Sequence, residues 1–339
     1  MREPAFWWRA PGLLAALLAP LGALYGAVAA RRMAQAGAHA RAPVICIGNL
    51  TLGGSGKTPA AIAIARMLLA EGERPAFLTR GYGGRLAGPI VVEPTHTATD
   101  VGDEPLLLAR VAPTIVARDR VAGADAVPAD TTVIVMDDGF QNPSLEKNIA
   151  VLVIDGKRGI GSGKVFPAGP LRAPLKPQLD RCLALLVVGE PGESARGLME
   201  ASFRDLLPSL MGRLVPDPDA TARLADRQVL AFAGIGDPEK FYATLRAAGI
   251  AVAQTRSFAD HHVFTASEAA ELITDADSRD LMLVTTEKDH ARMTGNPALA
   301  ALAARSETLP VRLVIDHENA LRSMLSSVSR GSRSTANKS

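Results

Sequence analysis

Residues 42–70, APVICIGNLTLGGSGKTPAAIAIARMLLA, join an apolar run, a glycine-rich turn and an alanine- and leucine-rich run without interruption. The first run, 42–48, is short and contains β-forming residues, which predicts a buried strand. The last run, 59–70, contains good helix formers and is followed by Gly72, which predicts a helix that ends there. A strand, a glycine turn and a helix in this order are the setting of a phosphate-binding P-loop.

The turn, Thr51-Leu52-Gly53-Gly54-Ser55-Gly56-Lys57-Thr58, supplies the groups that a P-loop needs. In such a loop the backbone N–H groups wrap the phosphates, the lysine spans the β- and γ-phosphates, and the threonine hydroxyl holds Mg²⁺. Only the first position departs from the pattern, because Thr51 stands where a glycine is usual. The glycines that remain still permit the tight backbone, so we expect all eight residues to bind a nucleotide.

Two acidic residues follow another apolar strand. Asp137 and Asp138 come directly after the run 133–136, and P-loop folds hold Mg²⁺ with a carboxylate at the end of a central strand. Either residue can serve as the ligand, and a solvated acidic turn is the alternative. ATP is favoured over GTP, because Thr286-Glu287-Lys288-Asp289 has its lysine one residue later than the guanine-recognition motif.

Runs of β-forming residues alternate with helical stretches, notably 104–111, along the first part of the chain. The expected strands lie at 76–79, 90–92, 114–117, 132–136, 149–154 and 183–188. This alternation predicts an α/β fold of the P-loop NTPase type, with a mostly parallel sheet and helices on both faces. A second, smaller α/β alternation begins near residue 228.

Prolines and acidic residues interrupt the pattern at 208–219, which predicts a connection between domains. The tail is rich in Ser, Arg and Lys. We therefore expect an N-terminal membrane-associated helix over 1–35, a P-loop nucleotide-binding domain over 36–215, a smaller α/β domain over 216–325 and a disordered tail over 326–339.

The N-terminal segment 13–30 is almost free of charge and is bracketed by arginines. A helix lying at a membrane interface explains this pattern best, with Phe6, Trp7, Trp8 and Tyr25 as anchors. A full span is disfavoured because the run is short and contains a proline and glycines. A cleaved signal peptide lacks a good cleavage site, and a buried core helix is the remaining alternative.

Composition limits the other partners. The 37 basic and 35 acidic side chains leave a net charge of +2, so no overall field attracts nucleic acid. No obligate protein partner is evident. Cys46 and Cys182 lie in apolar runs and are the only cysteines, which favours buried thiols in a reducing compartment over a disulfide.

Further polar residues lie in loops near the expected ends of strands. Asp103-Glu104 follows a glycine at the start of a helix, where a carboxylate can accept the proton of an attacking hydroxyl or simply cap the helix. Asp260-His261-His262 can shuttle protons, bind a metal or form a surface loop. The segments 80–84, 118–120 and 169–172 each carry arginine, which suits phosphate recognition.

In this order the motifs resemble the tetraacyldisaccharide 4'-kinase family of lipid A synthesis, over about residues 4–325. The matching segments are the N-terminal aromatic and leucine-rich segment, 44–59, 79–84, 102–105, 137–141, 167–172, 260–262 and 285–289. The resemblance implies transfer of the ATP γ-phosphoryl group to the 4'-hydroxyl of a tetraacyl glucosamine disaccharide 1-phosphate. It also implies two α/β/α domains around a cleft, and peripheral attachment to the cytoplasmic face of the inner membrane.

The family's motifs carry roles to matching positions. Lys57 and Thr58 would serve the nucleotide and Mg²⁺, and Asp137 and Asp138 the metal. Asp103 would be the base-side carboxylate, oriented by His261 from the second domain. The expected substrate or phosphate contacts are Arg80, Tyr82, Glu104 and Arg120. Asn142 and Ala173 depart from the family pattern, which usually has His and an acid there.

A soluble P-loop ATPase switch that moves a partner protein is the alternative function. It would use the same P-loop and carboxylates without a lipid acceptor. The apolar N-terminal segment and the arginine-bearing loops favour the lipid kinase.

Overall fold

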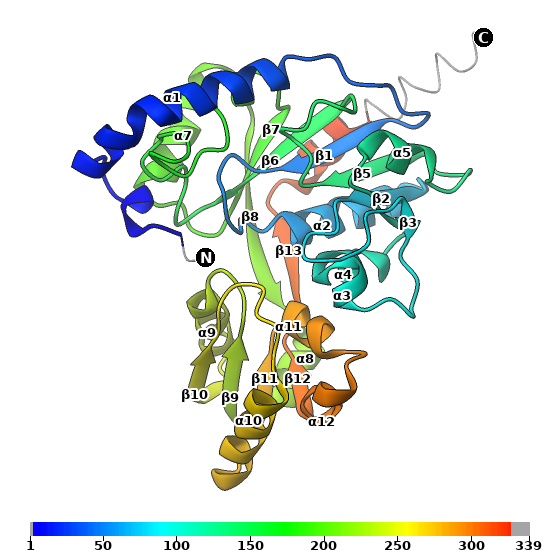
Figure 1. The fold of residues 1–339 in the computed structure, drawn as a ribbon, viewed down its shortest axis with the longest axis vertical. Helices are drawn as coiled ribbons and strands as arrows, with labels where there is room; N and C mark the ends of the chain where they lie inside the picture. Colours follow the sequence, from blue (N-terminus) through cyan, green and yellow to red (C-terminus); the bar gives the residue numbers. More distant parts are fainter. Residues whose placement is uncertain (1–2, 327–339) are drawn as a thin grey trace.

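A computed structural model describes residues 3–326 and contains two β-sheets. The larger sheet lies above the smaller one in Figure 1. Across the larger sheet the strands follow the order β13 (Val311–Ile315), β8 (Ser209–Pro216), β7 (Ala184–Val188), β6 (Ile149–Asp155), β1 (Val44–Gly48), β5 (Val133–Asp137), β2 (Pro75–Thr79), β4 (Thr114–Val116) and β3 (Ile90–Val91). Every neighbouring pair is parallel except β8 with β13 and β3 with β4.

Helices cover both faces of the larger sheet, as the alternating pattern predicts. They are α1 (Leu13–Met33), α2 (Lys57–Ala70), α3 (Ala98–Val101), α4 (Asp103–Ala109), α5 (Arg120–Asp125), α6 (Leu175–Leu179) and α7 (Glu193–Arg204), preceded by the 3₁₀ helix η1 (Ala5–Trp8). Figure 1 shows α1 above the sheet and α2 below it. Alternate residues of β1 point to the two cores: Cys46 lies in the same buried cluster as Met33 of α1, and Ile45 lies in the same buried cluster as Ile64 of α2.

The order of the strands creates a switch point at β1. Its parallel neighbours are β5 on one side and β6 on the other. The chain leaves β1 for β2 on the β5 side, and it later leaves β5 for β6 on the other side of β1, so connections from these neighbouring strands run in opposite directions. Open α/β sheets bind ligands beyond the carboxyl ends of the strands at such a point. Gly48 and Asp137 end β1 and β5 at this edge, so the glycine turn and the acidic pair meet there.

The smaller sheet is parallel throughout and has the order β10 (Ala251–Ser257), β9 (Gln228–Ala233), β11 (Met282–Thr285) and β12 (Ser306–Thr308). Its helices are α8 (Pro218–Leu224), α9 (Pro238–Ala247), α10 (Ala266–Ser278), α11 (Glu287–Met293), α12 (Ala300–Arg305) and the 3₁₀ helix η2 (Pro297–Leu299). Residues of α8 and α9 pack on one face, and residues of α10 and α12 pack on the other. The expected second α/β unit is present.

The segment 208–219, predicted as a connection, is mostly strand β8. Two of its three prolines lie at the ends of the strand, at 208 and 216, where a missing N–H does not interrupt the pairing, and Pro218 lies in the first turn of α8. Strand β13 then returns from the smaller unit to pair with β8, and Leu321 and Leu325 pack in the core beneath the larger sheet. The division into domains stays a prediction, but residues 311–325 belong structurally with the larger sheet.

Helix α1 is continuous from Leu13 to Met33 despite Pro20 within it. Its glycines permit close packing, because a Cβ on Gly22 would lie 2.8 Å from the Val165 carbonyl oxygen and one on Gly26 would lie 3.3 Å from Pro174. The helix is long and apolar enough to cross a membrane, with a mean hydropathy of 2.0, a property shared by core helices and signal sequences. Only 17% of its most apolar window is buried, which disfavours a core helix.

Trp7, which we expected to be a membrane anchor, is instead buried. It is 6% exposed and its indole Nε1 donates a hydrogen bond to the Pro167 carbonyl at 3.0 Å. The expectation for Trp7 was therefore wrong, because the indole fills a site in the body of the protein. The predicted disordered tail lies, apart from residue 326, outside the described residues.

Candidate active site

The glycine turn after β1 has the backbone that the P-loop pattern predicts. Gly53 and Gly56 have φ of 95° and 88°. Residues with a Cβ rarely adopt this left-handed backbone conformation. Gly56 is the N-cap of α2, so the first N–H groups of the helix face the turn. The Lys57 side chain is 10% exposed, and its Nζ lies 3.8 Å from Asp138 Oδ2.

Two polar side chains complete the turn. The Nδ2 group of Asn49 donates to the carbonyls of Thr51 and Gly53, at 2.7 and 3.3 Å, and thereby holds the turn closed. The Ser55 hydroxyl is buried and has no hydrogen-bond partner within residues 3–326. A buried polar atom of this kind is costly unless a ligand satisfies it, and a phosphate oxygen would do so.

Asp137 and Asp138 have different surroundings. Arg172 donates to both oxygens of Asp138, at 2.8 and 3.3 Å, and also to the Thr51 carbonyl at 2.9 Å. Burial raises the pKa of Asp138, but the charges of Lys57 and Arg172 outweigh it, and the net pKa is lowered. Arg172 thus joins the acidic pair to the glycine turn.

The Asp137 carboxylate is buried without a partner. Asp137 is 1% exposed, and neither of its carboxylate oxygens has a hydrogen-bond partner in the described part of the chain. Burial, and then the charge of Glu104, raise the pKa of Asp137 to about 7. Carboxylate oxygens are preferred Mg²⁺ ligands, so the orphaned pair of oxygens fits a cation. Thr58, 3% exposed at the start of α2, supplies a hydroxyl at the same end of the sheet.

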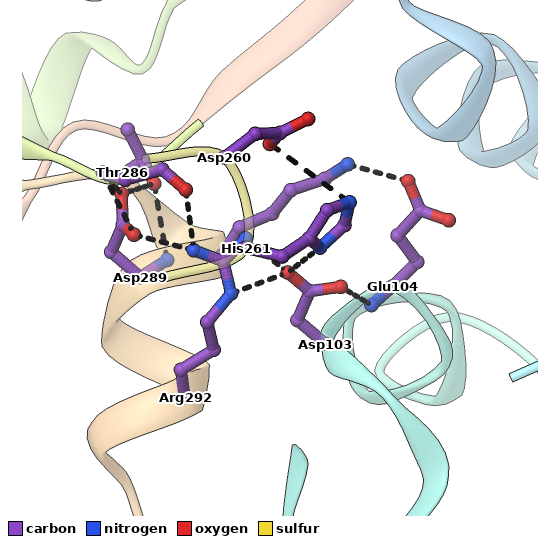
Figure 2. A network of polar contacts seen from close by, with 9 residues as sticks. Asp103, Glu104, Asp260, His261, Thr286, Asp289 and Arg292 are labelled. Atoms are coloured by element: carbon purple, nitrogen blue, oxygen red, sulfur yellow. Dashed lines mark hydrogen bonds and ion pairs between the residues drawn. The ribbon is translucent and has the colours of Figure 1, made fainter. Parts of the chain in front are cut away.

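Helices α4 and α11 contact each other through charged side chains. Glu104 accepts from Lys288 Nζ at 2.6 Å, and Arg110 pairs with Glu287 at 3.2 Å. Arg292 binds Asp103 through Nε at 2.8 Å and through Nη2. Figure 2 shows Asp103 and Glu104 facing side chains of the smaller unit, among them Arg292. Residues of the smaller unit therefore reach the carboxylates beside the glycine turn.

Asp103 also faces His261. The His261 Nδ1 atom lies 3.7 Å from Asp103 Oδ2, and the tilted Tyr82 ring lies 5.0 Å from the His261 ring. Burial raises the pKa of Asp103, but the polar contact with His261 and the charges of Arg292 and Lys288 outweigh burial and lower it well below its usual range. The carboxylate is therefore ionised near neutral pH. Asp103 is only 4% exposed, whereas the His261 side chain is 34% exposed.

The remaining predicted residues lie near this centre in different settings. Arg120 is buried, donates to the Ala117 carbonyl at 2.9 Å, and lies within electrostatic range of Asp137 and Asp138. Arg80 is exposed, and its charge acts on Arg120. Tyr82 is 65% exposed, so its ring is accessible to a substrate.

Two alternatives left open by the sequence can be compared with the structure. Gly102, not Asp103, is the N-cap of α4, but Asp103 Oδ1 accepts a hydrogen bond from the Glu104 N–H in the first turn at 2.8 Å. His262 binds Glu268 at 3.0 Å and stacks on Phe258, which is a structural role. No cluster of three or more His, Cys, Asp or Glu that could hold a metal occurs within residues 3–326, so a metal would rely on Asp137, Asp138 and Thr58 together with a ligand.

The two departures from the family pattern have local roles. The Asn142 side chain accepts a hydrogen bond from the Ser144 N–H at 2.8 Å and so supports a turn. Ala173 is completely buried in the core below α1, and its carbonyl accepts from Gln178 at 2.7 Å. Neither side chain contacts the glycine turn.

Several functional candidates escaped sequence reasoning. Lys288 was considered in a guanine motif and in the matching family segment 285–289 but was given no role, and Asn49 and Arg292 were not singled out. Their partners lie far along the chain: Arg292 binds a residue 189 positions earlier. The only sequence feature that could have indicated Arg292 is its position four residues after Lys288, because residues four apart share a helix face.

The ordered motifs and this geometry agree with a known family. A family model described as tetraacyldisaccharide-1-P 4'-kinase matches residues 14–330. The chain belongs to this family. The resemblance inferred from the motifs is confirmed, and membership identifies the protein as an enzyme of the kinase class.

Relatives of this family cover nearly the whole chain. The chain is 53% identical over 327 residues to the tetraacyldisaccharide 4'-kinase of Nitrobacter winogradskyi, covering 96% of this chain and 97% of that protein. It is 56% identical over 336 residues to that of Methylobacterium sp. (strain 4-46), covering 98% and 99%.

A solved structure shares the fold. It is an "apo" form of LpxK from Aquifex aeolicus in complex with ATP, with a TM-score of 0.68, 23% identity and coverage of 93% of this chain and 99% of that one. At this identity the likeness concerns the fold alone, and it confirms the predicted α/β architecture.

Proposed function

We propose that this protein transfers the γ-phosphoryl group of ATP to the 4'-hydroxyl of a tetraacyl glucosamine disaccharide 1-phosphate, forming lipid IVA. One observation carries the proposal: Glu104, next to Asp103, acts electrostatically on Asp137 beside the glycine turn, and residues of α11 in the smaller unit bind Glu104 and Asp103. The Asp137 carboxylate has no hydrogen-bond partner within residues 3–326. A candidate nucleotide site and a group that can accept a proton thus lie close together. Membership in the family supplies the identity of the acceptor.

On the nucleotide side, the N–H groups of the turn and the start of α2 would bind the β- and γ-phosphates, and Lys57 would neutralise their charge. Asp137, Asp138 and Thr58 would hold Mg²⁺, which when bound stabilises the charge that develops on the transferred phosphoryl group. Arg172 keeps Asp138 and the Thr51 carbonyl in fixed positions.

On the acceptor side, the Asp103 carboxylate would accept the proton of the 4'-hydroxyl as the hydroxyl oxygen bonds to the γ-phosphorus and the bond from the γ-phosphorus to the β-phosphate oxygen breaks. Asp103 is the base-side carboxylate, and His261 orients it from the smaller unit. Tyr82, Arg80, Glu104 and Arg120 would position the sugar or its phosphates. ADP and the 4'-phosphorylated lipid are the products.

We further propose that the protein acts at the cytoplasmic face of the inner membrane, held peripherally by α1. Leu13, Leu17 and Leu24 are 79%, 68% and 67% exposed. Contact of these leucine side chains with water is unfavourable, and their transfer to an apolar surface would be favourable. The opposite face of the helix packs on residues 165–174, so α1 would lie along the membrane while it stays attached to the catalytic body.

A phosphoryl-transfer assay tests the proposal. Purified protein is mixed with γ-labelled ATP, Mg²⁺ and detergent-dispersed tetraacyl disaccharide 1-phosphate, with Lys57→Ala as the inactive control. Label should enter the lipid with the wild type and not with the control. ATP hydrolysis without labelled lipid would contradict the proposed kinase activity and would support the alternative function as an ATPase switch.

A further inference from the structure

Arg292 makes several polar contacts, although the reaction steps described above give it no role. Its guanidinium donates through Nε and Nη2 to Asp103, and through Nη1 to the Gly234 carbonyl and to Asp289 Oδ1, both at 2.7 Å. The side chain is only 9% exposed. One buried guanidinium therefore binds α4 of the larger unit and two separate segments of the smaller unit.

The partners of Arg292 also hold the segment that carries His261. The Gly234 carbonyl, which Arg292 binds, accepts from the His261 N–H at 3.0 Å. The Gly234 N–H in turn donates to both oxygens of Asp289, each at 3.1 Å. His261 has φ of 55°, a conformation that persists only where the surroundings hold it. Through Gly234, Arg292 is thus linked to the backbone of His261 while it binds the Asp103 carboxylate directly.

The geometry of the guanidinium accounts for this arrangement. Its planar fork donates in several fixed directions, and here the Nε and Nη2 edge meets Asp103 while Nη1 meets Gly234 and Asp289. A lysine ammonium at this position would reach Asp103 or the Gly234 carbonyl but would not fix both in one plane. Figure 2 shows Arg292 between Asp103 and Asp289, with His261 beside Asp103.

We infer that Arg292 is a positioning residue for phosphoryl transfer, which sets the Asp103 carboxylate and the His261 turn in a single relative geometry. The inference rests on the proposed role of Asp103 and His261. The hydrogen bonds of Arg292 within residues 3–326 go to protein groups: Asp103, Asp289 and the Gly234 carbonyl. Its contribution lies in orientation, because a displacement of about 1 Å in reacting groups lowers rates by about 100-fold.

Kinetic constants of Arg292→Gln and Arg292→Lys test the inference. Arg292→Gln should lower kcat about 10- to 100-fold while the KM for ATP changes by less than about threefold. Arg292→Lys should recover part of kcat, because it retains the charge beside Asp103. The matched control is Arg110→Gln, which removes another ion pair between α4 and α11, to Glu287, and should leave kcat near the wild-type value.

Three results would overturn the inference: a folded Arg292→Gln variant with wild-type kcat, an equal loss of kcat in Arg110→Gln, or a loss in Arg292→Gln that Arg292→Lys does not relieve. If Arg292→Gln does not fold, Arg292→Lys provides the test. A wild-type kcat in Arg292→Lys would then contradict the inference.

A double-variant cycle shows whether Arg292 acts through Asp103. In an Asp103→Asn background, Arg292→Gln should lower the residual kcat by less than about threefold, because residues that act as a unit are not additive. A further loss as large as in the wild-type background would contradict the inference. The wild type is assayed first: absence of lipid phosphorylation there would count against the proposed function, whereas an active wild type with an equally active Arg292→Gln counts against the inference alone.

Discussion

Asp137 and Asp138 are neighbours in the chain, yet Arg172 binds both oxygens of Asp138 while both oxygens of Asp137 lack a partner within residues 3–326. The Asp137 carboxylate is also protonated more readily than that of Asp138, since burial and Glu104 raise the pKa of Asp137 to about 7. Asp138 already has its counter-ions in Lys57 and Arg172. Asp137 is therefore the carboxylate with most to gain from a bound cation.

Asp137→Asn should increase stability in Mg²⁺-free buffer at pH 8. An aspartate ionises near 3.9 in the unfolded chain and near 7 in the folded protein. As pH rises from about 4 to 7, only the unfolded state loses its proton, so the wild type loses stability, and above 7 the loss is constant. Asparagine avoids this cost, so the variant should gain about 1–4 kcal/mol at pH 8 and little at pH 4.

Urea unfolding at both pH values, without and with Mg²⁺, measures this effect. Mg²⁺ should stabilise the wild type and have less effect on the variant, which has lost a negatively charged ligand. Equal or lower stability of the variant at pH 8 would show that Asp137 already has a counter-ion in solution. Kinase activity should fall in the same variant, since stability and function conflict at such sites.

The N-terminal segment reaches the glycine turn. A Cβ on Gly53 would lie 1.8 Å from Glu3 Oε1, so the carboxylate lies against the turn, and Arg158 binds it at 2.8 Å. Phosphates at the turn would meet this negative charge. Glu3→Gln should therefore lower the KM for ATP by about two- to tenfold. Glu200→Gln, an exposed acid on α7, is the control of equal charge, and an unchanged KM in Glu3→Gln would show that Glu3 moves away before ATP binds.

Local patterns were enough to predict most of the larger sheet. The strands with continuous apolar runs, such as β1 and β5, and the turn at 51–58 lie where the sequence predicts them. β8 was missed because its burial is uneven and Gly212 and Pro216 lie within it. Its partner β13 lies about a hundred residues later, and no local pattern reports such pairing.

The site was predictable where its chemistry is local and not where it depends on distant partners. The glycine turn and the acidic pair each have a motif. Arg172 was expected to bind phosphate, whereas in the structure it binds Asp138 and the Thr51 carbonyl. Only the folded chain reveals this partner, because Arg172 and Asp138 belong to separate loops at one edge of the sheet.

Both thiols should resist alkylation in the native protein. Burial raises the pKa of Cys46 and of Cys182 to about 12, so only about one thiol in 10⁴ is ionised at pH 8. Iodoacetamide should label neither thiol until denaturant is added, as measured by mass spectrometry. Ser267→Cys, at an exposed site on α10, should be labelled rapidly and serves as the control. Rapid native labelling of Cys46 would require β1 to open.

The exposed leucines of α1 allow the membrane contact to be tested without removing the helix. Deletion would also uncover Val165 and Pro174, which pack against Gly22 and Gly26, so substitutions at the surface are the cleaner change. Leu17→Gln with Leu24→Gln should lower binding to anionic lipid vesicles at least about tenfold, because each leucine transferred from water contributes about 1.5–3 kcal/mol.

The control for this prediction is Leu69→Gln. Leu69 is 43% exposed near the end of α2, and Figure 1 shows α2 on the opposite side of the larger sheet from α1. This variant should bind vesicles like the wild type in a flotation assay. Activity on detergent-dispersed lipid should stay unchanged in both variants, because neither surface touches the glycine turn. Full vesicle binding by the α1 variant would mean that another surface attaches the protein to the membrane.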